Sequence, residues 1–104
     1  MTLDDAAARL EALGNPTRLN IYRTLVRAGE CGLSVSALRE RVGGALSTLS
    51  HHLQKLVLVG LVLQERQGTT LICRANYDQM HGLVDYLTKE CCADEAAACQ
   101  GDAA

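Results

Sequence analysis

The spacing of apolar residues along the chain predicts helices that are separated by short turns. From about residue 3 to 13, apolar residues recur at steps of three and four, and Gly14 follows the last of them. Asn15 and Pro16 come next, a capping residue and a proline of the kind that begin a helix, and this second helix runs to Gly29. The residues expected to point inward are Leu3, Ala6, Ala7, Leu10 and Leu13 in the first helix and Leu19, Tyr22, Leu25 and Val26 in the second.

Two more helices follow, joined by a glycine pair. Ser34 is a capping residue for a short third helix, which ends at Gly43-Gly44. A fourth helix is predicted from Leu46 to about Val59, and Gly60 stops it. Its expected inward residues are Leu46, Leu49, Leu53 and Leu56.

The pattern then changes from helical to strand-like and back. Residues 61–67 and 70–75 are rich in Val, Leu, Ile and Thr and flank Gly68, which predicts a two-stranded hairpin. Asn76 is placed to cap a last helix. The apolar residues of that helix are Tyr77, Met80, Leu83, Val84 and Leu87.

This order of elements is typical of a winged helix-turn-helix, a mainly α fold with a small β-hairpin. A chain of 104 residues fits one such domain, predicted over residues 1–90. Residues 91–104 are predicted to be a mobile, cysteine-containing tail, since they are acidic and rich in alanine. The first and last helices carry more apolar surface than a small monomer buries, so we expect a homodimer through these two helices.

Charge is distributed unevenly along the chain. The formal net charge is −2, but residues 15–75 hold eight basic and three acidic side chains, and both ends are acidic. A basic centre is compatible with binding to phosphates. The acidic N-terminus lacks the features of an export signal, and no apolar stretch approaches the ~20 residues of a membrane-spanning helix. We therefore expect a cytoplasmic protein that does not bind membranes.

The polar side of the fourth helix is the candidate for reading double-stranded DNA. When its leucines point inward, His51 points nearly opposite them, flanked by Ser47, Thr48, Gln54 and Lys55. These side chains suit base edges and phosphates in a major groove, although a solvated helix face is the alternative for any polar stripe. Adjacent helical residues diverge by about 100°, so His51 and His52 do not form a metal site. His52 falls at the border of the core face and is expected to be a packed or partly exposed imidazole. In the hairpin, Arg66 near the tip is the best phosphate contact and Arg74 a weaker one.

Two stretches of the sequence carry a family resemblance. LGNPTRLNIYRTL, and STLSHHLQKL followed by GLV, resemble the ArsR/SmtB family of winged-helix metalloregulatory repressors, over roughly residues 7–90. The resemblance implies a homodimer that binds a palindromic operator and leaves it when an inducer binds. It also implies that Ser47, Thr48, Ser50 and His51 face the DNA, whereas the helical wheel places Ser50 on the flank of that face.

The cysteines near the C-terminus are the candidate sensor. Cys91 and Cys92 are adjacent and are expected to close the last helix, and Cys99 follows after six intervening residues, so three thiolates can converge. Thiolates select soft ions, and trivalent arsenic or antimony suits three sulfurs, whereas zinc prefers four ligands. The chain lacks the cysteine pair that older arsenic sensors of the family carry before the recognition helix, and resembles a branch with a C-terminal cluster. The expected inducer is As(III) or Sb(III), with no permanently bound cofactor.

Several alternatives stay open at this point. Cys92 and Cys99 can form a reversible disulfide, which makes a thiol redox switch, or the cluster can sense cadmium or lead. The cluster can also be incidental, or the domain a winged-helix module that binds protein and not DNA. An enzyme is disfavoured, since the sequence has no C-x-x-C and no phosphate-binding glycine loop. Cys73 is expected to be a small buried apolar residue, and Cys31 a loop residue without a role.

Overall fold

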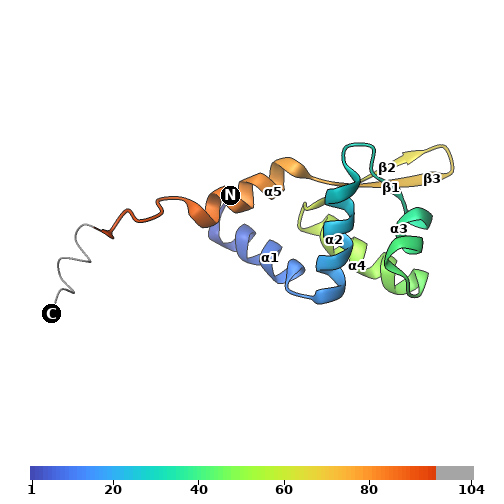
Figure 1. The fold of residues 1–104 in the computed structure, drawn as a ribbon, viewed down its shortest axis with the longest axis horizontal. Coiled ribbons are helices and arrows are strands. Elements are labelled where there is room, and N and C mark those ends of the chain that lie inside the picture. Colours follow the sequence, from blue (N-terminus) through green and yellow to red (C-terminus); the bar gives the residue numbers. More distant parts are fainter. Residues whose placement is uncertain (96–104) are drawn as a thin grey trace.

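Capping residues set the boundaries of the helices in the computed structural model, which describes residues 1–95 (Figure 1). The Asn15 side chain accepts a hydrogen bond from the Arg18 backbone N–H at 3.1 Å, and Ser34 and Asn76 act in the same way at two later helices. All three predicted caps are therefore confirmed. The elements are α1 (Leu3–Leu13), α2 (Pro16–Ala28), β1 (Leu33–Ser34), α3 (Val35–Val42), α4 (Leu46–Leu58), β2 (Val62–Gln67), β3 (Thr70–Ala75) and α5 (Tyr77–Thr88).

The sheet has one strand more than the sequence predicts. The hairpin of β2 and β3 is confirmed, with Val62 opposite Ala75 and Gln67 opposite Thr70, and Gly68 has a φ of 64° in the tight turn. The two residues of β1 pair with the far side of β3, so the strand order is β1-β3-β2. A strand of two residues leaves no periodic signal, because only its pairing with a distant strand defines it.

The core is aliphatic, as the composition requires. Three of the four predicted leucines of α4, Leu49, Leu53 and Leu56, are buried, and they pack in one cluster with side chains of α2, α3 and the sheet. The prediction for Leu46 is wrong, because 46% of this residue is exposed in the first turn of α4. The prediction for Leu19 is also wrong: Arg18 takes the buried position in that turn of α2, and Leu19 points about 100° away from it.

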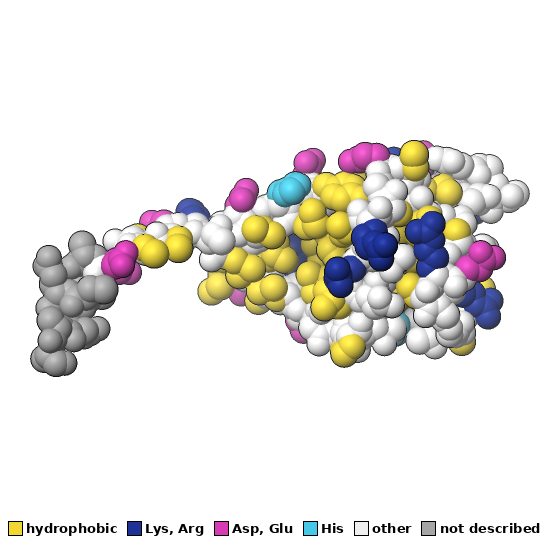
Figure 2. Space-filling view, in the orientation of Figure 1, with side chains coloured by type: hydrophobic (Ala, Val, Ile, Leu, Met, Phe, Trp, Pro, Cys, Tyr) yellow, Lys and Arg dark blue, Asp and Glu magenta, His cyan; other side chains and the backbone are white. Residues whose placement is uncertain are grey.

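One apolar surface remains uncovered, over α1 and α5. These two helices pack side by side, and apolar side chains gather over them in the space-filling view (Figures 1 and 2). Leu3, Val84 and Leu87 are each more than half exposed, and Leu10 is 42% exposed. Exposed apolar side chains clustered on two adjacent helices are typical of a protein interface. Their position agrees with the predicted dimer contact.

The C-terminal part differs from the prediction in one respect. The prediction that Cys91 and Cys92 close the last helix is wrong, since α5 ends at Thr88 and the chain continues in turns, with positive φ at Glu90 and Cys92. The predicted tail lies largely in residues 96–104, outside the described residues. Among residues 1–95, no helix has the length and apolar character needed to cross a membrane.

The exposed surface of α1 and α5 predicts that Val84→Asp weakens self-association while each protomer stays folded. A buried Val side chain contributes roughly 1.5 kcal/mol or more, so loss of this residue should weaken the dimer about tenfold or more. Sedimentation at micromolar concentration measures the effect. Leu63→Asp, which changes a comparably exposed apolar residue of β2, is the control and should not alter self-association. Wild-type protein that sediments as a monomer would contradict the interface.

Candidate nucleic-acid interface

Helix α4 presents the predicted reading residues together on its exposed side. Gly43 and Gly44, both with positive φ, turn the chain from α3 into α4. The three buried leucines then fix which side of α4 faces the core. The exposed residues of α4 include the whole predicted set, namely Ser47, Thr48, Ser50, His51, Gln54 and Lys55. Ser50 is exposed like the others, which is compatible with the family resemblance as well as with a flanking position.

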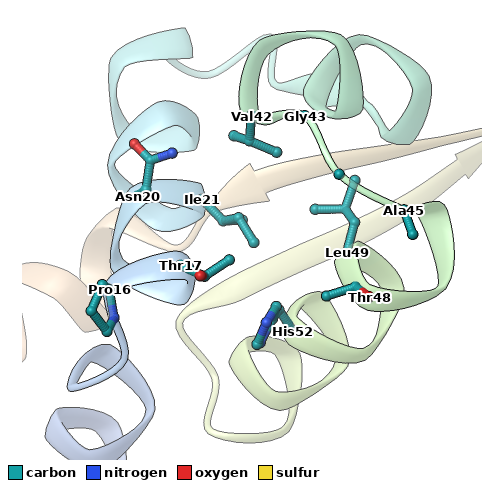
Figure 3. A pocket seen from close by; sticks show the side chains of 11 residues that line it. Pro16, Thr17, Asn20, Ile21, Val42, Gly43, Ala45, Thr48, Leu49 and His52 are labelled. Atoms are coloured by element: carbon teal, nitrogen blue, oxygen red, sulfur yellow. The ribbon is translucent and has the colours of Figure 1, made fainter.

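Two hollows flank this exposed side of α4. On one side, Thr48 and His52 line a pocket of about 360 Å³ together with Thr17 and Asn20 of α2 (Figure 3). On the other side, Ser50 and Gln54 line a pocket of about 210 Å³ that Gln64 of β2 and Leu71 of β3 also border. His51 lines neither pocket, in agreement with its position at the centre of the polar face. Helix α4 therefore lies between α2 and the hairpin of β2 and β3, the wing of the fold, and its polar side is open.

A buried arginine fixes the rotation of α4. Arg18 is only 8% exposed, and its Nε donates to the Ala12 carbonyl at 2.8 Å, at the end of α1. Its Nη1 lies 3.3 Å from Nδ1 of His52 on α4. A guanidinium has only donors, so Nδ1 of His52 must accept, and the imidazole must be neutral with its proton on Nε2. Burial, and after it the charge of Arg18, lowers the pKa of His52 and favours that neutral form.

The sequence contains a signal for this link that the prediction did not use. His52 was expected to be a packed or partly exposed imidazole, which is confirmed, but its partner was not anticipated. Arg18 stands three residues before Ile21, four before Tyr22 and seven before Leu25, the spacing of a buried helix face. An arginine on such a face needs acceptors nearby.

A second arginine contacts the C-terminal end of α4. Arg9 of α1 donates from Nε to the Val59 carbonyl at 2.9 Å, just past the last turn of the helix. The carbonyls at the end of a helix lack partners within it, and a cation there also meets the negative end of the helix dipole. Arg9 and Arg18 therefore both join α4 to α1.

The two arginines of the wing that the sequence proposes as phosphate contacts differ in their partners. Nη2 of Arg74 donates to Oε2 of Glu65 at 2.7 Å across the hairpin, so its charge is already paired. Arg66 is exposed next to the tip, and none of the carboxylates in the described chain forms an ion pair with it. This difference favours Arg66 as the wing residue that is free to contact phosphate.

The cysteines fall into two groups. Cys91 and Cys92 are exposed, and their Sγ atoms lie 3.5 Å apart. Cys99 is outside the described residues, and within residues 1–95 no three His, Cys, Asp or Glu side chains gather as metal ligands. Cys73 is fully buried, and burial raises the pKa of its thiol, which confirms it as a small apolar core residue. Cys31 is exposed in the loop between α2 and β1.

Comparison with known proteins gives consistent matches. Residues 13–65 match a helix-turn-helix domain family. The chain is 38% identical over 73 residues to the nodulation protein NolR of Rhizobium meliloti, covering 70% of this chain and 57% of NolR. It thus spans little more than half the length of the curated relatives it matches.

Solved structures show the same architecture. NolR from Sinorhizobium fredii has a TM-score of 0.66 at 34% identity, with 83% of each chain covered. A homodimeric winged helix-turn-helix DNA-binding domain from Mycobacterium bovis, described as a possible ArsR-family transcriptional regulator, has a TM-score of 0.65 at 32% identity, with 86% of this chain and 82% of that one covered. The predicted fold class is confirmed. The matched family and neighbours are DNA-binding transcriptional regulators and not enzymes.

The link between Arg18 and His52 predicts a stability that decreases in mild acid. The pKa of His52 is lowered from 6.5 in the folded protein, so the unfolded chain takes up a proton first as the pH falls. The free energy of unfolding therefore keeps its full value above pH 6.5 and decreases as the pH falls below it. Urea denaturation at about pH 7.5 and 5.5 measures this change, and His52→Gln should reduce it because an amide accepts without titrating.

His81→Gln provides the control, since His81 is exposed on α5 and forms no hydrogen bond with Arg18. This variant should keep the pH dependence of the wild type. Equal pH dependence in the wild type and His52→Gln would show that the contact does not depend on a neutral imidazole.

Proposed function

Since this chain belongs to the ArsR/SmtB family of winged-helix transcriptional regulators, we propose that it is a DNA-binding repressor that acts as a homodimer. The observation that carries the proposal is the continuous polar side of α4, from Ser47 to Lys55, exposed opposite three buried leucines. A helix of this kind fits the major groove, and the adjacent hairpin reaches the neighbouring backbone. No other surface of residues 1–95 combines a helix-turn-helix with a wing.

The side chains on α4 divide into two kinds of contact. Ser47, Thr48, His51 and Gln54 offer donors and acceptors suited to base edges, where a good bidentate pair contributes roughly 1–3 kcal/mol of discrimination. Lys55, like Arg66 in the wing, offers charge to phosphates, which positions the protein without reading sequence. The first group provides specificity and the second affinity.

The homodimer sets the form of the operator. Two copies related by a two-fold axis through α1 and α5 present two α4 helices in opposite directions. The operator of such a dimer is palindromic, with half-sites spaced by about one or more DNA turns of ~34 Å. The exposed apolar residues of α1 and α5 support this arrangement.

Trivalent arsenic or antimony is the inducer that we propose. Cys91 and Cys92 bring two exposed sulfurs within 3.5 Å of each other, and Cys99 is close enough in sequence to supply a third. Arsenous acid exchanges its three hydroxyl groups for three thiolates: three As–S bonds form, three As–O bonds break, and the thiol protons leave in three waters. The site therefore needs no other reactant.

The DNA contact predicts that His51→Ala weakens binding to the operator by about tenfold, since it removes a side chain from the centre of the polar face. Fold and self-association should stay as in the wild type, because His51 is exposed. Fluorescence anisotropy with operator and scrambled duplexes measures the loss. Wild-type affinity in this variant would remove α4 from the interface.

Arg66→Ala is the matched comparison. It should weaken binding to both duplexes equally and reduce the dependence of log K on log salt by about 0.9, the slope for one phosphate contact. Loss of sequence preference alone would contradict a phosphate role for Arg66.

The sensing proposal predicts that Cys91→Ser, Cys92→Ser and Cys99→Ser each reduce arsenite-driven release from DNA. Cys31→Ser and Cys73→Ser should not, because neither belongs to the cluster. The same anisotropy assay, with arsenite added to the protein–operator complex, measures release, and X-ray absorption should show three sulfur neighbours around arsenic. Full release in the triple Ser variant would place the sensor elsewhere, and release by peroxide alone would indicate a redox switch.

A further inference from the structure

A second basic surface lies on α2 and α3, separate from the exposed side of α4. Arg27 of α2 and Arg41 of α3 are both exposed and line one pocket of about 370 Å³, together with Asn20 and Thr24. Lys and Arg side chains gather over α2 and α3 in the space-filling view (Figure 2). Neither arginine is among the DNA contacts proposed above.

The lining of this pocket is suited to an anion. It contains two guanidinium groups and no carboxylate, and within residues 1–95 neither arginine has an ion pair. Arg23 lies one helical turn before Arg27, so like charges repel along α2. The hydroxyl of Thr24 already donates to the Asn20 carbonyl at 2.8 Å, so its proton is used within the helix. The available donors are the two guanidinium groups and the Asn20 amide.

We propose that Arg27, Arg41 and Asn20 bind a phosphate group. Two guanidinium forks that come from different helices need an anion with oxygens on more than one side. A tetrahedral phosphate offers this, whereas a carboxylate presents two oxygens in one plane. The site differs from the wing contact of Arg66 because donors from two helices converge in one pocket.

The DNA backbone beside the reading helix is one source of the phosphate, and in that case the proposal rests on the proposed function. Asn20 lines this pocket and also the neighbouring one that Thr48 of α4 borders, so the two pockets meet at Asn20 and the site of Arg27 and Arg41 adjoins the reading side of α4. Figure 3 shows Asn20 and Thr48 in the lining of the neighbouring pocket. A free phosphorylated small molecule is the other source. The chemistry of the site is the same for both.

Two measurements on the full-length dimer test the proposal. The first titrates inorganic phosphate into the wild type, Arg27→Ala, Arg41→Ala and the control Arg23→Ala, and follows arginine side-chain and backbone NMR signals. The control removes the same charge from α2 without removing a pocket residue. The second measures affinity for two operator duplexes, one ending at the half-sites and one extended by a helical turn at each end. All three arginines are exposed, so each variant should keep the melting temperature of the wild type, and measuring it checks that the variants fold.

We expect the NMR signals of the wild type and Arg23→Ala to shift saturably as phosphate is added. In Arg27→Ala and Arg41→Ala the affinity for phosphate should be about tenfold or more lower, as for loss of one charge-assisted pair. If DNA is the source, these two variants also lose affinity for the long duplex and not for the short one, and the salt slope falls by about 0.9. If a free anion is the source, the phosphate shifts are lost and both duplexes bind as in the wild type. Wild-type behaviour of both variants in both measurements would overturn the site. A wild type that binds phosphate but neither duplex would refute the proposed function and leave the pocket intact.

Discussion

The guanidinium of Arg18 is buried where α1, α2 and α4 meet, and its surroundings must supply acceptors because burying an unpaired charge is costly. The Ala12 carbonyl is one acceptor, and it lies in the last turn of α1, where carbonyls lack helical partners and the dipole is negative. Nδ1 of His52 is the other. The hydrogen bonds of the Arg18 side chain therefore fix the end of α1, the start of α2 and the rotation of α4 together. The direction in which His51 and its neighbours point depends on that contact as well as on the leucines of the core.

The two sides of α4 place opposite demands on its sequence. Leu49, Leu53 and Leu56 are almost fully buried, so a smaller residue there opens a cavity that the close-packed core does not fill. The exposed residues have no partner within the described chain to satisfy and are free to be polar, which is why specificity can be carried there without loss of stability. Arg9 and the turn at Gly43 and Gly44 define where the helix ends and begins. In the proposed repressor, stability and recognition thus occupy separate faces of a single helix.

The sequence predicts those features that local pattern determines. Helix caps at Asn15, Ser34 and Asn76, the hairpin around Gly68 and the polar side of α4 all follow from residues close together in the chain, and all are found. Features that depend on a distant partner were missed or misassigned. Strand β1 exists only because β3 lies beside it, and Leu19 is displaced because Arg18 finds acceptors on two other helices. Leu46 is exposed because no element within residues 1–95 fully covers its side of α4. The pocket of Arg27 and Arg41 is of the same kind, since two arginines 14 positions apart give no sign in the sequence that they share it.

The same contacts define how an event at the end of α5 can reach α4 in the proposed repressor. Helix α5 packs against α1, and the Tyr77 hydroxyl at its start donates to the Val26 carbonyl at 2.8 Å, so α5 is joined to α2 as well. From α1, Arg9 reaches the Val59 carbonyl, and the Ala12 carbonyl accepts from Arg18, which contacts His52, so displacement of α1 acts on the middle and the C-terminal end of α4. An inducer held just beyond α5 need only favour one packing of α5 on α1 over another. A tenfold loss of DNA affinity then corresponds to about 1.4 kcal/mol of differential binding, and by reciprocity the DNA-bound protein binds the inducer tenfold more weakly. In the proposed repressor such a bias can change the angle of α4 through the hydrogen bonds of Arg9 and Arg18, since a close-packed core leaves little free volume to absorb the displacement.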